Sequence, residues 1–284
     1  TASENITVNV GKQVDFTGQV DDLTGSSDAD IFTADQSVPD IELGDQADGG
    51  NGIDTLEVTG AQSANNLNVL GSGAISSIEI LDITLRAASD DDAIHVDADD
   101  FSNDLTEIRF TTADGSDPVK ADNGDSLTID NLFSGTNVVF NNDAGVFTIT
   151  NVVSPESPGS VNVTLAGDVT LSDIVDTNSD LNSVTITSNG SGDEANEVSA
   201  ITGALDTDAE IFLEGSQDLT VKGFAGAQDL GSIDGSAADG DLTVDASGLG
   251  TDSGSGDDAF SIAGGSGNDN LTGLSDQNTM LEGN

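Results

Sequence analysis

Residues 49–57 read GGNGIDTLE and residues 264–272 read GGSGNDNLT. Both segments fit the nine-residue pattern G-G-x-G-x-D-x-U-x at every fixed position, where U is a large apolar residue. The glycines allow a tight turn that directs carbonyl oxygens inward. The apolar residue then begins a short strand whose side chain enters the core. A repeat of this kind predicts stacked turns of parallel strands.

The aspartate of the pattern points to a metal. It adds a carboxylate to the carbonyl oxygens of the turn, and Ca²⁺ prefers a shell made entirely of oxygen atoms. We predict several Ca²⁺ ions, with direct ligation by Asp54, Asp258 and Asp269. The other residues that we predict at the metal sites are Asp30, Asp48, Gly50, Gly52, Gly256, Gly265 and Gly267. A Gly/Asp turn that precedes a strand without binding metal is the alternative.

Degenerate copies of the pattern accompany the two complete ones. Residues 253–261 (SGSGDDAFS) have Ser for the first Gly, and residues 25–33 (GSSDADIFT) keep the Asp and the apolar residue. Residues 273–281 are a weaker copy, with Asn278 where Asp belongs. The starts of the copies at 253 and 264 are separated by more than one repeat length. This spacing departs from that of an ideal site shared between them.

Charge is the second strong feature. The chain has 53 acidic and 5 basic residues, a formal net charge of −48. It has no basic patch to neutralise phosphates, so we predict no nucleic-acid partner. Self-repulsion on this scale opposes compaction unless salt screens it or bound divalent cations neutralise it. A halophilic or marine source is an alternative explanation of the acidity, and it is compatible with metal binding.

The remaining composition favours a folded chain without catalytic machinery. Hydrophobic residues make up 35% of the chain and lie in short β-branched runs, and there is no cysteine. No apolar run approaches the length of roughly 20 residues that crosses a bilayer, so we predict no membrane insertion. The one histidine, His95, lies among aspartates and is predicted to be a strand-surface residue. No nucleophile elbow, P-loop or HExxH motif is present, and we predict that the protein is not an enzyme.

Short strands recur along the chain with a loose period of roughly 20–27 residues. This predicts an all-β fold, a β-solenoid or parallel β-roll with irregular rungs; tandem β-sandwich domains are the alternative. We divide the chain into an N-terminal β region with nonapeptide turns (1–60), two segments of solenoid rungs (61–153 and 154–235) and a calcium-binding β-roll (236–284). The chain stops within a repeat, so we expect it to be a fragment.

The order of the motifs resembles a known family. It comprises VDDLTGSSDADIFTA at 20–34, GDQADGGNGIDTLEV at 44–58, IDGSAADGDLTVDAS at 233–247 and the turns of 253–272. Over most of the chain this resembles the RTX-type surface-layer proteins and related β-strand-repeat surface proteins of Gram-negative bacteria. The resemblance implies type I secretion, a secreted or cell-surface location, folding by calcium outside the cell and calcium-dependent assembly.

These observations lead to two functional hypotheses. The first is an extracellular structural protein that folds and self-assembles, as an S-layer lattice or matrix fibre, on binding Ca²⁺. Its partners would be further copies of the chain, joined through Ca²⁺-bridged contacts, and a cell-surface polysaccharide. The alternative is a calcium-rigidified stalk or binding module of an RTX adhesin.

Overall fold

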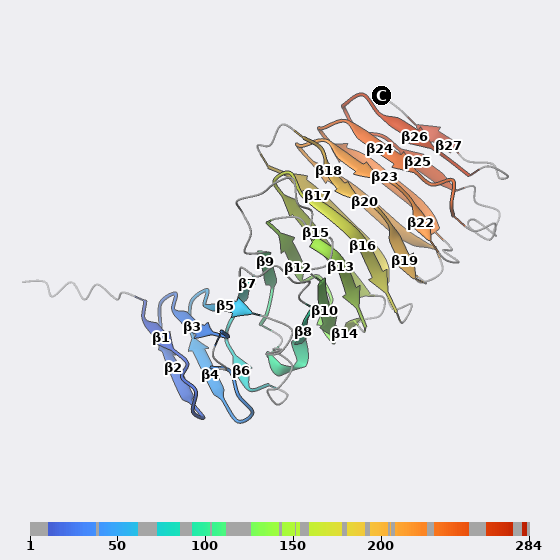
Figure 1. Ribbon diagram of the computed structural model, residues 1–284. Coiled ribbons are helices and arrows are strands. Elements are labelled where there is room, and N and C mark those ends of the chain that lie inside the picture. The colour runs from blue at the N-terminus through green and yellow to red at the C-terminus, as the bar shows by residue number, and fades with distance from the viewer. Residues whose placement is uncertain are drawn as a thin grey trace, which may run out of the picture.

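The chain winds back and forth between parallel sheets that stack along one axis (Figure 1). A computed structural model describes residues 11–37, 40–61, 73–85, 93–102, 104–111, 126–141, 144–150, 152–153, 159–177, 181–190, 194–203, 205, 208–225, 230–249, 260–274 and 280–282. In this part of the chain the structure is almost entirely β, and its one helical element is the short 3₁₀ turn η1 (Ala98–Asp100).

Twelve strands form the long sheet, which runs from one end of the described chain to the other. In spatial order they are β1 (Gln13–Asp15), β3 (Ile31–Asp35), β5 (Thr55–Ala61), β7 (Ile80–Leu85), β9 (Glu107–Thr111), β12 (Asn137–Phe140), β15 (Gly159–Ala166), β17 (Leu181–Asn189), β20 (Ala209–Gly215), β23 (Leu230–Ala238), β25 (Ser261–Ala263) and β27 (Met280–Glu282). Each strand pairs in parallel with the strand of the next rung.

Ten strands form the facing sheet, on the other side of the core. They are β8 (Ala93–Asp97), β10 (Ser126–Asp130), β13 (Ala144–Ile149), β16 (Thr170–Asp176), β18 (Asn196–Val198), β19 (Ile201–Gly203), β21 (Leu219–Val221), β22 (Phe224–Ala225), β24 (Leu242–Asp245) and β26 (Asn270–Thr272). In the first rungs its place is taken by the N-terminal sheet of β2 (Asp22–Ser26), β4 (Gln46–Gly50) and β6 (Ile75–Ser76). A short pair joins β11 (Leu132–Phe133) and β14 (Val152–Val153).

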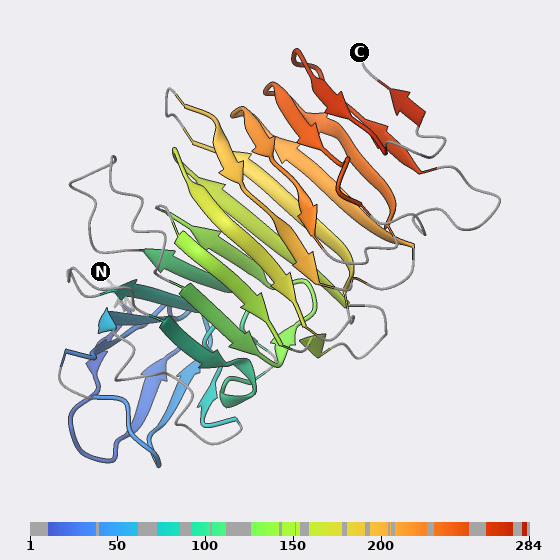
Figure 2. The same ribbon diagram turned by 45° about the vertical axis from the view of Figure 1, so that its right-hand side comes forward.

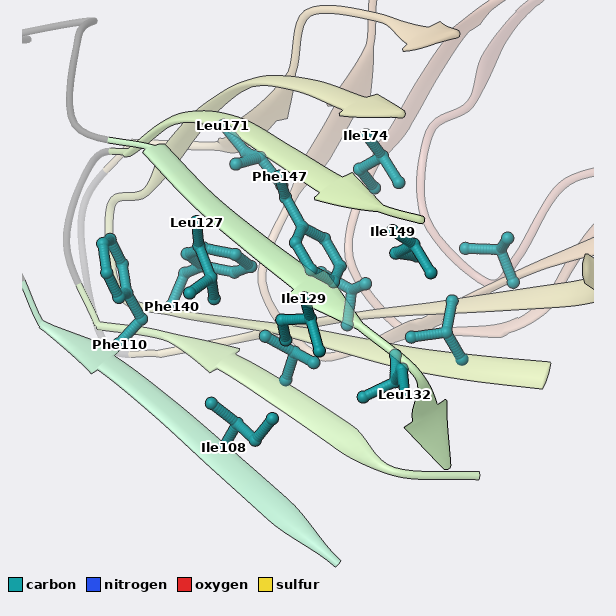
Figure 3. Packing of buried hydrophobic residues seen from close by; sticks show 14 of the residues in the cluster. Ile108, Phe110, Leu127, Ile129, Leu132, Phe140, Phe147, Ile149, Leu171 and Ile174 are labelled. Carbon is teal, nitrogen blue, oxygen red and sulfur yellow. The ribbon is translucent and has the colours of Figure 1, made fainter. Parts of the chain in front are cut away.

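The sequence alternation places one apolar face of each sheet in a common core. In β15 the side chains of Val161, Val163 and Leu165 are fully buried, and the residues between them are partly exposed. Figure 3 shows side chains of the two sheets directed toward one another, with Phe110 and Phe140 from the long sheet and Phe147 from the facing sheet. Phe140 lies edge-to-face against both partners, with ring centroids 5.9 Å and 5.5 Å apart. Burial of these columns of side chains is the main force that holds the rungs together.

The register shows how much chain each turn takes. Along the long sheet the shortest step joins Gln13 to its partner Ile31, and the longest joins Glu107 to Asn137. The rungs are therefore irregular, as predicted, but over a wider range than the sequence suggested. The parallel pairing confirms the β-solenoid and excludes the β-sandwich alternative, whose sheets are antiparallel. The long sheet passes through all four segments proposed above, whose limits stay a prediction.

Candidate metal centres

The two complete nonapeptides lie at opposite edges of the solenoid. We call the corners that lead into long-sheet strands the entry edge, and the corners that follow those strands the exit edge. Residues 49–57 connect β4 to β5 and lie at the entry edge, whereas residues 264–272 connect β25 to β26 and lie at the exit edge. The two edges are at opposite ends of the long-sheet strands because all these strands run in parallel.

At the entry edge the nonapeptide turn stacks directly on the degenerate turn of residues 25–33. Thr24 pairs with Asp48 and Ser26 with Gly50, so Gly25 lies beside Gly49. The contact is close: a Cβ atom on Gly25 would lie 2.1 Å from the carbonyl oxygen of Gly49. Only glycine permits this approach, which explains why the pattern requires it.

Side chains of successive rungs form a column at this edge. Lys12, Asp30, Asp54 and Glu79 each precede a residue of the paired strands β1, β3, β5 and β7. The backbone N–H of Asp30 donates to Oδ1 of Asp54 over 2.6 Å, and that of Asp54 donates to Oε2 of Glu79 over 2.7 Å. The N–H of Lys12 donates in the same way to Asp30. Each carboxylate therefore satisfies a backbone donor of the preceding rung.

In Asp54 one carboxylate oxygen of this column, Oδ2, has no hydrogen-bond partner among the described residues. The side chain of Asp54 is fully buried. Burial raises the pKa of Asp54, the hydrogen bond from Asp30 opposes that rise, and the negative charges of Glu79, Asp30 and Asp48 add to it. A buried carboxylate oxygen without a partner is costly. A bound cation would remove that cost.

Asp30, one rung earlier, has partners within the protein. Its carboxylate accepts hydrogen bonds from the N–H and hydroxyl of Ser26 as well as from Lys12. Burial opposes ionisation, but these hydrogen bonds and the charge of Lys12 outweigh it and hold the pKa of Asp30 below its usual value. The Lys12 ammonium also donates to the carbonyl oxygens of Gly25 (3.0 Å) and Thr24 (3.4 Å). The positive charge at this corner is therefore supplied by the Lys12 ammonium.

At the exit edge Asp269 repeats the arrangement of Asp54. Its Oδ1 accepts the backbone N–H of Leu242 in the preceding rung over 3.0 Å, and its Oδ2 is buried without a hydrogen-bond partner in the described structure. A Cβ atom on Gly264 would lie 2.3 Å from this Oδ2, and one on Gly265 would lie 2.1 Å from the carbonyl oxygen of Ala238. The turn thus brings a carboxylate and backbone close together, as the sequence pattern predicted.

The other predicted residues contribute in different ways. Gly50 and Gly52 have φ angles of 96° and 134°, which favour glycine, and a Cβ on either would clash with the turn of the preceding rung. Asp48 is exposed, and its Oδ1 accepts the N–H of Gly50 over 3.1 Å. Gly267 approaches the carbonyl oxygen of Gly240 in the same close manner as Gly265 approaches Ala238.

Gly256 and Asp258 lie outside the described residues. Their assignment as metal ligands stays a prediction.

Within the described residues no group of three or more His, Cys, Asp or Glu side chains has an arrangement that could hold a metal ion. Any ion at Asp54 or Asp269 would therefore take most of its ligands from backbone carbonyl oxygens, which Ca²⁺ accepts readily.

Sequence reasoning missed three residues of these corners. Two are Lys12 and Glu79. The third is Asn196 at the exit edge, whose Oδ1 accepts the backbone N–H of Val169 in the preceding rung. A signal existed for Glu79, because it follows Asp54 at almost the same interval as Asp54 follows Asp30. The basic residue and the amide carry no such signal, because their positions become meaningful only with the register known.

The basic side chains described in the structure all contact oxygen atoms. Arg109 lies beside Glu107 and Asp82, and Lys222 forms an ion pair with Glu197. His95 is on the strand surface and contacts Asp130, as predicted for a residue among carboxylates. These pairs leave the large negative charge of the chain almost unchanged.

Comparison of the chain with models of protein families, with curated proteins and with solved structures found no match. The resemblance to RTX-type surface-layer proteins thus stays a prediction. Among the described residues there is no helix with the length and apolar character needed to span a bilayer.

Proposed function

We propose that this protein is an extracellular structural protein in which bound Ca²⁺ completes the stacked turns and promotes self-assembly. The observation that carries the proposal is the buried Oδ2 atom of Asp54, which has no hydrogen-bond partner among the described residues. Asp269 repeats it at the other edge. Both aspartates occupy the D position of a complete nonapeptide, where sequence reasoning placed a metal ligand.

The chemistry of these corners favours Ca²⁺ over Mg²⁺. Each corner offers one carboxylate and closely packed backbone carbonyl oxygens, such as those of Ser77 and Gly49 at the entry edge. Ca²⁺ accepts six to eight oxygen ligands in flexible geometry, whereas Mg²⁺ requires a near-ideal octahedron and usually retains several waters. A bound ion would also favour the ionised form of Asp54, against the effect of burial on its pKa.

Charge gives calcium a second role. With a formal net charge of −48, two copies of the chain repel one another at low ionic strength. Divalent cations bound between acidic surfaces would remove this barrier. Solenoids also present strand edges at their ends, where further strands can pair. We therefore propose a homopolymer, either a lattice or a fibre, which forms when calcium is supplied outside the cell.

A calcium-rigidified stalk is the second candidate. The unbroken twelve-stranded sheet favours it, because such a stack is an elongated spacer without need of assembly (Figure 2). A secreted location, a polysaccharide partner and the lack of enzymatic activity remain predictions under both proposals.

The decisive experiment is a Ca²⁺ titration of EGTA-treated protein at constant ionic strength, followed by far-UV circular dichroism and light scattering. We expect additional β-structure and large particles to appear together when calcium is added, and both gains to be lost on chelation. A gain of β-structure without particles would support the stalk. If Mg²⁺ or NaCl has the same effect, screening of charge and not site binding explains the response.

Variants connect the response to the two corners. Asp54→Ala and Asp269→Ala should each raise the calcium concentration needed for folding. Glu210→Ala removes one carboxylate from an exposed position of β20 and should leave that concentration unchanged. The metal assignment is wrong if all three variants fold at the same calcium concentration as the unaltered protein.

A further inference from the structure

Asn196 and Asp269 occupy the same place at the exit edge, three rungs apart. Each is the residue that enters the facing sheet after a corner, in one column with Val169, Leu219 and Leu242. In both residues Oδ1 accepts a backbone N–H of the preceding rung, from Val169 over 2.7 Å and from Leu242 over 3.0 Å. The Oδ1 atoms of the two side chains therefore have the same role: each accepts a backbone N–H of the preceding rung.

The second polar atom of the side chain differs between the two residues: it is Nδ2 in Asn196 and Oδ2 in Asp269. Asn196 is fully buried, and its Nδ2 donates to Oγ of Ser188 (2.9 Å) and to the carbonyl oxygens of Leu165 (3.2 Å) and Asn189 (3.4 Å). The corresponding atom of Asp269 is the buried Oδ2 without a partner in the described structure. An amide supplies the N–H that carbonyl oxygens require, whereas a carboxylate is only an acceptor. A cation is needed to join Asp269 to similar oxygen atoms.

The neutral side chain of Gln217 also helps to close the corner around Asn196. Nε2 of Gln217 donates to Oδ1 of Asp168 (2.9 Å) and to the carbonyl oxygen of Glu194 (2.5 Å). Its Oε1 accepts from Asn196 over 3.5 Å. Hydrogen bonds within the protein therefore satisfy the buried side-chain atoms of this corner, and none of its described carboxylates has a buried oxygen without a partner.

At the entry edge, too, hydrogen-bond donors take positions that carboxylates have in other rungs. In the column that contains Asp54 and Glu79, the next two positions are Thr106 and Thr136. Their hydroxyl groups donate to carbonyl oxygens of the preceding rungs, Thr106 to Glu79 over 3.2 Å and Thr136 to Leu105 over 3.4 Å. In the first rung the Lys12 ammonium performs this task for Gly25 and Thr24. Donors belonging to the protein thus replace the metal at these corners.

We propose that calcium is required only by the rungs around Asp54 and Asp269, and that the central rungs, closed by Thr106, Thr136 and Asn196, fold without metal. This inference rests on the proposed calcium binding. It divides the solenoid into a metal-independent centre and two metal-dependent regions, one toward each end. Removal of calcium would then open the ends and leave the centre folded.

Hydrogen exchange of the full chain, followed by mass spectrometry in calcium and in EGTA, tests the division. At a calcium concentration 100 times the dissociation constant, binding stabilises its region by about 2.7 kcal/mol, so exchange should be about 100-fold slower than in EGTA. We expect this difference for peptides from β4–β5 and β25–β26. Peptides from β15–β18 should exchange equally in both conditions. An equal response of the centre would overturn the inference.

Reciprocal variants test the cause. Asp269→Asn should make the β25–β26 corner equally protected in EGTA and in calcium, and Asn196→Asp should make β17–β18 protected only in calcium. Glu210→Gln, which removes one charge from the exposed face, should change neither pattern. If Asn196→Asp does not fold at all, Asp269→Asn decides alone.

The outcomes separate this inference from the proposed function. If no region of the unaltered protein responds to calcium, the proposed function fails and this inference fails with it. If the ends respond but Asp269→Asn remains dependent on calcium, only the inference is wrong.

Discussion

Alanine at Gly49 would insert a methyl group where two rungs touch. A Cβ atom there would lie 1.9 Å from the carbonyl oxygen of Ser77, whereas real Cβ contacts essentially never fall below 3.0 Å. The rungs must then separate locally by roughly 1 Å, about a quarter of the ~4.8 Å spacing between neighbouring strands. Overpacking costs about 1–3 kcal/mol. We expect the upper part of this range, because the obstructing atom belongs to the backbone.

The assay is hydrogen exchange of β4 and β5 at saturating calcium, because a solenoid does not unfold as one unit. A loss of about 3 kcal/mol corresponds to an increase of roughly 150-fold in the exchange rate. Gly223→Ala is the matched control, because its Cβ would meet no atom within 4 Å. It should leave stability unchanged or raise it by about 0.4–1 kcal/mol. If the two variants have equal effects, the close contact between rungs does not explain the glycine of the pattern.

Three further predictions concern the core, one half-buried acid and one surface ion pair. Phe140→Leu removes two edge-to-face ring contacts, each worth about 0.5–1.5 kcal/mol. Hydrogen exchange of β12 should show a local loss of about 1–3 kcal/mol, and no loss would contradict the packing. Burial raises the pKa of Asp173, although the Thr202 hydroxyl opposes the rise. Protonated Asp173 therefore contributes its full stabilisation of the folded protein below the unfolded-state pKa, and this contribution is lost as the pH rises through the folded-state pKa. Asp173→Asn should therefore be more stable than the unaltered protein at pH 7, and unfolding midpoints should converge below the ordinary aspartate pKa of about 3.9; a constant difference across this range would refute the argument. Lys222→Ala breaks an exposed ion pair with Glu197 and should cost less than about 1 kcal/mol, a difference that high salt should abolish in the same assay.

The parallel solenoid could be predicted because the apolar alternation and the two nonapeptides both indicate stacked parallel strands. Individual strands were harder to locate. β4 has the sequence QADGG, which has low strand propensity, and it is extended because β2 and β6 pair with it on either side.

An aliphatic–Thr–aliphatic motif recurs in the sequence at residues 127–129, 169–171, 219–221 and 242–244. It shows both the strength and the weakness of spacing as a guide to the fold. Val169, Leu219 and Leu242 lie in one column of the facing sheet, as their steps suggested. Leu127 carries the same motif but lies in a different column, with Phe147 and Ile174. Because the turns vary in length, similar motifs can stand at different positions of a rung.

Variable turn length also limits prediction of the sites. The nonapeptides predict Asp54 and Asp269 as metal ligands, and both have a buried oxygen without a hydrogen-bond partner among the described residues. The pattern did not indicate that they lie at opposite edges. It also could not identify Lys12 and Asn196, because these side chains take the place of the aspartate and therefore erase the pattern that would reveal them.

The single-rung stacking of the long sheet has a mechanical consequence. A force that pulls the two ends apart along the axis acts on the outermost rung first, because each rung is held only by its neighbours. A folded rung adds only ~4.8 Å to the length of the stack. Once pulled out, its roughly 20–30 residues extend to about 60–100 Å. The molecule would lengthen in discrete steps and dissipate work at each one, as an extensible tether does, while the rungs that remain keep their shape.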